Sequence, residues 1–169
     1  MGYAEFLISA VTVGSGGSSS IDFTSIPSTY TDLKVVLSSR NTRNDASVFA
    51  TIQLSFNGST ANRSRKSLYN VSGSTGSDSS TDIIFVGTSS TATSNTFDNI
   101  EFYIPNYTSS NYKSVSVDST TENNGTAVYQ ILTAGLWSST SAINQITLTP
   151  TGYNFVQYST AYLYGIKNS

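Results

Sequence analysis

The stretch that most constrains the fold is VFATIQLSFNG, residues 48–58, where apolar and polar side chains alternate. Successive side chains of a strand point to opposite faces, so five apolar residues would share one face: Val48, Ala50, Ile52, Leu54 and Phe56. A helix would instead place Thr51 and Ser55 on the apolar side. Asn57-Gly58 follows, and both residues tolerate the positive φ of a tight turn. The stretch therefore predicts a strand that buries one face against a core.

Similar runs recur between turn-rich segments and predict about nine or ten strands and no helix. The expected strands cover residues 3–13, 21–26, 33–40, 48–56, 82–86, 97–104, 112–119, 126–137, 142–149 and 155–166. Residues 59–67 and 73–81 are so polar that we expect exposed loops, with a short edge strand over 68–71 between them. The pattern predicts an all-β fold, an antiparallel β-sandwich that is jelly-roll-like with one or two extra edge strands, as a single domain over residues 1–169.

The composition excludes several classes of function. Charged residues make up 11% of the chain and the net charge is −2, so nothing favours nucleic acid or an anionic membrane as a partner. Cysteine and histidine are absent, which excludes disulfides, Ser-His-Asp and Cys-His nucleophiles and ordinary zinc or copper sites. No apolar run approaches the roughly 20 residues of a membrane span, and the N-terminus lacks the basic region of a secretory signal. We expect a soluble protein without a targeting segment.

The ten carboxylates lack the arrangement of a catalytic or metal site. No spacing pairs two of them as the acid and nucleophile of a glycosidase would be paired. Asp78 and Asp82 lack the alternating oxygen ligands of a calcium loop. We therefore predict that the protein is not an enzyme, has no catalytic or metal-binding residues and needs no cofactor.

Five of the eight cationic side chains fall in two expected loops: Arg40, Arg43, Arg63, Arg65 and Lys66. Together they would suit contact with an acidic surface of a partner protein. The alternative is that they are solvated loop residues without a partner.

The two end strands carry more apolar and aromatic residues than one sandwich core should absorb. In the first strand Phe6 and Leu7 would face opposite sides, and the end of the chain contains Tyr158, Tyr162 and Tyr164. Tyrosines at interfaces bury the ring and keep the hydroxyl wet. We predict that the chain forms a homo-oligomer through these tyrosines, with a trimer as the expected state.

Another pair of tyrosines gives an alternative binding role. Tyr107 and Tyr112 lie beside Asn106 and Asn111 in one expected loop. Exposed rings can stack on sugar and amides can bind hydroxyl groups, so this loop could contact a glycan. Because tyrosine and asparagine are abundant throughout the chain, such a loop also arises by chance.

Four motifs resemble a family of small structural proteins of tailed bacteriophages, common in phages of marine cyanobacteria. They are LSFNG at 54–58, IPNY at 104–107, GLWSSTSAINQITL at 135–148 and STAYLYGI at 159–166. The opening EFLISAVTV and IDFTSIP also fit the family. The motifs correspond to strands and turns, so the resemblance implies a virion part and carries no catalytic residues.

The resemblance leaves two roles open, and length favours one of them. A fibre protein usually has a long trimeric shaft and an attachment domain, which this chain lacks. A free-standing sandwich of 169 residues suits a decoration, or cement, protein on the outer surface of the capsid, made in the host cytoplasm and bound to the major capsid protein. The alternative is a receptor-binding or tail-fibre-type module that recognises a host surface glycan.

Overall fold

Strands make up almost all of the regular structure of the chain. The structure is a computed structural model that describes residues 3–122, 124 and 128–168. Within these residues there is no helix, and the strands are β1 (Tyr3–Thr12), β2 (Ile21–Phe23), β3 (Asp32–Ser38), β4 (Phe49–Phe56), β5 (Arg63–Val71), β6 (Ser74–Ser80), β7 (Ile84–Thr88), β8 (Asn99–Ile104), β9 (Lys113–Thr121), β10 (Tyr129–Trp137), β11 (Ile146–Pro150) and β12 (Thr160–Asn168). The prediction of an all-β protein is confirmed.

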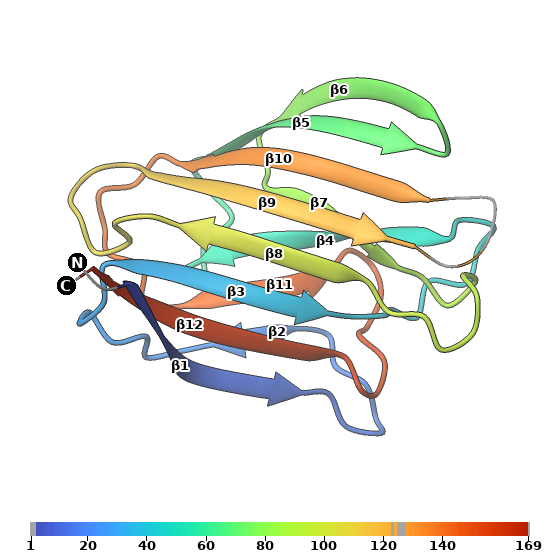
Figure 1. The fold of residues 1–169 in the computed structure, drawn as a ribbon, viewed down its shortest axis with the longest axis horizontal. Coiled ribbons are helices and arrows are strands. Elements are labelled where there is room, and N and C mark those ends of the chain that lie inside the picture. Colours follow the sequence, from blue (N-terminus) through green and yellow to red (C-terminus); the bar gives the residue numbers. More distant parts are fainter. Residues whose placement is uncertain (1–2, 123, 125–127, 169) are drawn as a thin grey trace.

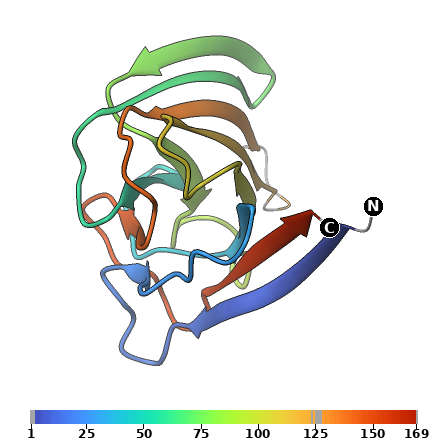
Figure 2. The ribbon, with the colours of Figure 1, turned by 90° about the vertical axis from the view of Figure 1, so that its left-hand side faces the viewer.

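These strands form two antiparallel sheets that pack together (Figure 1). The larger sheet has eight strands in the order β1-β12-β3-β8-β9-β10-β5-β6. The smaller sheet has four strands in the order β2-β11-β4-β7. Apolar side chains from both sheets fill the space between them, and Figure 2 shows the layers from the side.

Eight of the strands follow the path of a jelly roll. The chain alternates between the sheets from β1 to β4, and it alternates again from β7 to β12 once the inserted strands are set aside. As a result β1-β12-β3-β8 faces β2-β11-β4-β7, which is the arrangement of two interleaved Greek keys. The prediction of a jelly-roll-like sandwich is therefore confirmed.

Four further strands widen the larger sheet beyond the jelly roll. Strands β5 and β6 are inserted between β4 and β7, and β9 and β10 are inserted between β8 and β11. Their pairings continue outward from β8 in the order β9, β10, β5 and β6. We call these four strands the sheet extension. The prediction of one or two extra strands is therefore too low.

The stretch 48–58 forms β4 and its turn, as its alternation predicts. Four of its apolar side chains are buried: Ala50, Ile52, Leu54 and Phe56. The ring of Phe56 packs against Trp137 of β10, with the ring centroids 5.3 Å apart. Asn57 and Gly58 have φ of 51° and 69°, the left-handed conformation of a tight turn. Strand β4 therefore contacts both the core of the jelly roll and, through the ring of Phe56, the sheet extension.

The expectation of exposed loops at 59–67 and 73–81 is wrong, because β5 and β6 cover most of both segments. Their side chains are polar, but β5 pairs with β10 over its whole length and β6 pairs with β5. Ser72 and Gly73, with φ of 50° and 88°, form the turn between β5 and β6. Backbone pairing, rather than an apolar pattern, makes these segments extended.

Strand β1 is an edge strand of the larger sheet and pairs only with β12 among the described strands. Its apolar side chains point to both sides, as predicted, but within one chain they stay uncovered: Phe6 is 45% exposed and Leu7 is 57% exposed. Phe6 touches Tyr30, whose ring lies against Gly165 so closely that any larger side chain there would overlap it. Figure 2 shows β1 and β12 leaving the body of the sandwich at an angle.

Candidate functional site

Arg40, two residues after the end of β3, binds the backbone of the loop between β7 and β8. Its guanidinium donates hydrogen bonds of 2.8–2.9 Å to four backbone carbonyls, those of Ser90, Ala92, Thr93 and Thr96. The side chain is buried, and burial lowers its pKa. Arg40 is therefore occupied within the chain and does not offer its charge to a partner surface.

Asp98, at the end of the same loop, binds Ser39, which directly follows β3, and Thr88 of β7. One carboxylate oxygen accepts a hydrogen bond from Ser39 N at 2.6 Å, and the other accepts from Ser39 Oγ at 2.7 Å and Thr88 N at 3.0 Å. Burial raises the pKa of Asp98 to about 7, although these hydrogen bonds favour the ionised form. Carboxyl groups with shifted pKa values occur at active sites. The carboxyl of Asp98, however, is buried, and its hydrogen bonds connect separate segments of the backbone.

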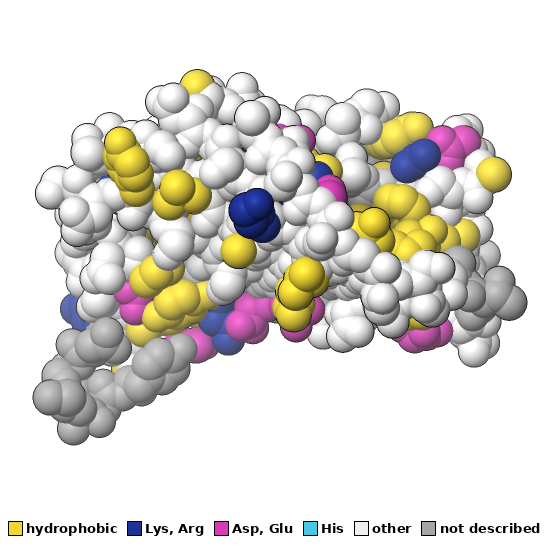
Figure 3. Space-filling view, turned by 90° about the horizontal axis from the view of Figure 1, so that it is seen from above, with side chains coloured by type: hydrophobic (Ala, Val, Ile, Leu, Met, Phe, Trp, Pro, Cys, Tyr) yellow, Lys and Arg dark blue, Asp and Glu magenta, His cyan; other side chains and the backbone are white. Residues whose placement is uncertain are grey.

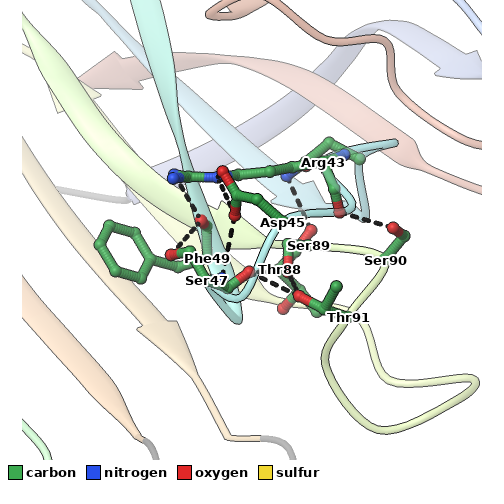
Figure 4. Close-up of polar contacts among 9 residues, drawn as sticks. Arg43, Asp45, Ser47, Phe49, Thr88, Ser89, Ser90 and Thr91 are labelled. Carbon is green, nitrogen blue, oxygen red and sulfur yellow. Dashed lines mark hydrogen bonds and ion pairs between the residues drawn. The ribbon is translucent and has the colours of Figure 1, made fainter.

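Arg43 organises the exposed loop before β4 (Figure 4). Its Nε donates to both oxygens of Asp45, at 2.9 and 3.0 Å, and its Nη1 donates to the carbonyl of Phe49 at 3.0 Å. The guanidinium also lies 5.8 Å from the ring centroids of Phe49 and Tyr153. The hydrogen bond with Arg43 lowers the pKa of Asp45. The charge of Arg43 is therefore paired within its own loop.

Arg63 and Arg65 point into the molecule from β5, and both are buried. Arg63 donates to the carbonyls of Leu54 and Thr60, and Arg65 forms ion pairs with Asp78 and Asp82. These contacts explain how a polar sequence forms a strand of the sheet extension. Placing either arginine on a partner surface is wrong, because both side chains are enclosed.

Lys66 is the member of the predicted basic group that is exposed to solvent. Lys66 lies on β5 between Arg65 and Ser67. Its side chain points to the side of the sheet opposite to the one on which Arg63, Arg65 and Ser67 are buried. The structure therefore does not bring the five cations together: three support the interior, Arg43 is paired with Asp45, and Lys66 is available.

The two tyrosines predicted to contact a glycan have different environments. Tyr107 is fully buried, and its hydroxyl donates to the carbonyl of Pro27. It cannot stack on a sugar, so its prediction as a glycan contact is wrong. Tyr112 is 60% exposed, but the buried Tyr107 cannot provide a second exposed ring beside it.

The tyrosines predicted for an oligomer interface are exposed in part. Tyr162 and Tyr164 project from β12 on the same side of the sheet, opposite Val36 and Lys34 of β3. Tyr158 precedes the strand and is exposed in the left-handed conformation, with φ of 72°. The structure therefore brings Tyr162 and Tyr164 to one face and leaves Tyr158 in a loop.

That face is the side of the larger sheet turned away from the smaller sheet, and we call it the outer face. In Figure 1 it is the side toward the viewer. Over the sheet extension and β8 the outer face holds a hollow of about 870 Å³. Exposed side chains in the hollow include Leu68, Leu132, Asp118, Ser116 and Lys66. Figure 3, which looks down on the β5 and β6 end, shows a surface mostly of uncharged polar side chains and backbone, with separate hydrophobic patches and scattered charges.

Sequence reasoning missed this hollow, although one signal was present. In TAGLW and neighbouring residues of β10 the apolar Leu132 and Leu136 alternate with Thr133 and Gly135, and the leucines are the exposed set. We assumed that the apolar set of each strand faces the core. A strand whose inward positions are Thr and Gly breaks that assumption.

Two further classes of site are not found in the described residues. Nowhere in residues 3–122, 124 and 128–168 do three Asp or Glu side chains gather as metal ligands would. The same part of the chain has no helix with the length and apolar character needed to span a membrane.

Comparison with protein-family models, with curated proteins and with solved structures finds no match to this chain.

Proposed function

We propose that this protein is a structural component of a bacteriophage virion that decorates the outer surface of the capsid and stabilises it, with the major capsid protein as its partner. The similarity of its motifs to small phage structural proteins supports the virion assignment. The fold supports a binding role, because jelly-roll sandwiches are frequent in capsid proteins and the enclosed Asp98 offers no catalytic access.

The motif residues have structural roles that suit such a protein. Asn57 of LSFNG accepts hydrogen bonds from the backbone of Asn144 and Gln145, at 2.9 and 3.2 Å, and donates to the carbonyl of Ala142 at 2.8 Å. Gly165 of STAYLYGI makes room for the Tyr30 ring. These motif residues stabilise turns and strands, as expected of a structural protein.

The observation that carries the proposal is the uncovered edge at β1. Natural edge strands are usually blunted by lysine, proline or shortness, because a free edge pairs with other chains. Strand β1 is ten residues long and contains neither lysine nor proline, and it exposes Phe6 and Leu7; its register against β12 shifts once, between Leu7 and Ser9. Its charged residue, Glu5, lies 3.3 Å from Lys34. Such an edge suits burial against a neighbour in an assembly.

The first test measures binding to phage heads purified without this protein. We expect saturable binding and greater resistance of the decorated heads to heat. Leu7→Lys should lower occupancy at least tenfold, because it places a charge in a contact that buries apolar surface. Leu132→Lys is the matched control, since Leu132 is 55% exposed but lies on the sheet extension; it should bind heads normally.

Two results would contradict the proposal. One is the absence of saturable binding to heads, and the other is saturable binding to host cells with none to heads. The second result would instead support the receptor-binding alternative.

Self-association belongs to the same proposal. A trimer joined through β1 and the tyrosines of β12 would cover Phe6, Leu7 and Tyr162, which one chain leaves exposed. Burial of these side chains would contribute to assembly through the hydrophobic effect.

A further inference from the structure

The outer face of the sheet extension is organised into rows that run across the strands. Pairing places Leu68, Leu132, Asp118 and Glu101 directly opposite one another, from β5 through β10 and β9 to β8. The next row, two residues along, contains Lys66, Ala134, Ser116 and Tyr103. All eight residues line the 870 Å³ hollow. The hollow therefore has a fixed pattern of chemical groups on a rigid sheet.

The first row combines two kinds of contact. Leu68, 65% exposed, and Leu132 are cross-strand partners and form an apolar strip. Beside them Asp118 and Glu101 stand opposite each other, although like charges at such positions destabilise a sheet. Lys34 lies 3.1 Å from Glu101. Within the described residues Asp118 makes no hydrogen bond or ion pair, so its oxygens are free to accept hydrogen bonds from a ligand.

The composition of the hollow argues against a protein partner. Protein interfaces are depleted in Lys, Glu, Asp, Ser and Ala at their centre, and these are the residue types of Lys66, Glu101, Asp118, Ser116 and Ala134. The floor of the hollow is formed by β5, β10, β9 and β8, which have a neighbour on each side, so their backbone groups are used in strand pairing and cannot pair with a peptide strand. Side chains alone must recognise the ligand.

We propose that this hollow binds a short chain of neutral sugar residues. Hydroxyl-rich ligands are recognised by carboxylate, hydroxyl and ammonium groups, here Asp118, Ser116 and Lys66. The C–H faces of sugar rings can pack on the strip of Leu68 and Leu132. The volume lies in the range of ligand sites, roughly 300–1,000 Å³. Carboxylates outnumber free cations here, which disfavours acidic sugars. This site goes beyond capsid decoration and does not depend on it.

Calorimetric titration with neutral and acidic oligosaccharides tests the site. The neutral probes are cellohexaose, maltohexaose, mannohexaose and xylohexaose, and the acidic probe is hexagalacturonic acid. We expect at least one neutral probe to bind and the acidic probe not to bind. Asp118→Ala should weaken binding about tenfold or more, the effect of losing a hydrogen bond to a charged group. Asp118→Asn should retain part of the affinity.

Two variants complete the design. Ser116→Trp should abolish binding, because it fills the hollow between Tyr103 and Ala134. Tyr112→Ala is the matched control, since it removes an exposed ring outside the hollow, and it should bind as the unmodified protein does. Thermal unfolding of each variant checks that the fold is intact.

The proposal fails if no neutral probe binds at millimolar concentration, if hexagalacturonic acid binds more tightly, or if Asp118→Ala and Ser116→Trp bind like Tyr112→Ala. It also fails if Ser116→Trp prevents binding to phage heads while no sugar binds, which would make the hollow a protein contact. Failure of head binding alone leaves the sugar titration unaffected, so the two proposals are tested separately.

Discussion

Asp98 shows how one buried carboxyl group can make stability depend on pH. Its hydrogen-bond donors, Ser39 and Thr88, are neutral, and burial raises its pKa from 3.8 to about 7. The folded protein therefore holds this proton more tightly than the unfolded chain. The resulting stabilisation is complete below about pH 4 and is lost as the pH rises through 7, with a magnitude of the order of 4 kcal/mol.

Urea unfolding of the protein and of Asp98→Asn between pH 4 and pH 8 measures this effect. We expect the free energy of unfolding of the parent protein to fall with pH relative to that of Asp98→Asn, which has no proton to lose. Parallel profiles for the two proteins would show that Asp98 does not titrate in this range.

Arg40 and Lys66 can be compared at the residue scale, because both belong to the predicted basic group but have different environments. Arg40→Met removes the donors to four loop carbonyls and should cost at least about 3 kcal/mol, since each buried unsatisfied group costs roughly 1–3 kcal/mol. Lys66→Met changes an exposed side chain and should stay within about 0.5 kcal/mol. Urea unfolding measures both, and equal losses would contradict the internal role of Arg40.

At the scale of elements, the sequence predicts well where apolar residues alternate toward a core. Strand β4 is such a case, because its buried apolar residues Ala50, Ile52, Leu54 and Phe56 recur at every second position. Strands β5 and β6 could not be predicted in this way. The inward side chains of β5 are Arg63, Arg65 and Ser67, and β6 is extended because β5 lies beside it.

The candidate sites follow the same distinction. A single sequence does not show that Arg63 and Arg65 turn inward, or that Leu68, Leu132 and Asp118 become neighbours, because these facts depend on strand pairing between distant segments. Tyr107 misled us for a related reason. It belongs to the core cluster and its hydroxyl binds the carbonyl of Pro27, which is remote in sequence.

At the scale of the whole molecule, the exposed edge at β1 predicts association. Sedimentation velocity at micromolar concentration should detect a species of three times the 18.0 kDa chain mass. Leu7→Lys should shift the protein to monomer. The substitution removes the apolar contact of Leu7, and burial of an unpaired charge at the interface is unfavourable. Leu132→Lys should leave the trimer intact. A parent protein that sediments only as a monomer would contradict self-association through β1.

The pairing order of the sheet extension also implies an order of dependence. The pair of β9 and β10 attaches directly to β8 of the jelly roll, through β9, whereas in the described residues the β5–β6 hairpin is attached to the sheet through β10. A chain shortened by β5 and β6 would keep every other strand pairing of the larger sheet. A chain shortened by β9 and β10 would lose the strand on which β5 pairs, so the insertion that comes earlier in the chain depends on the one that comes later.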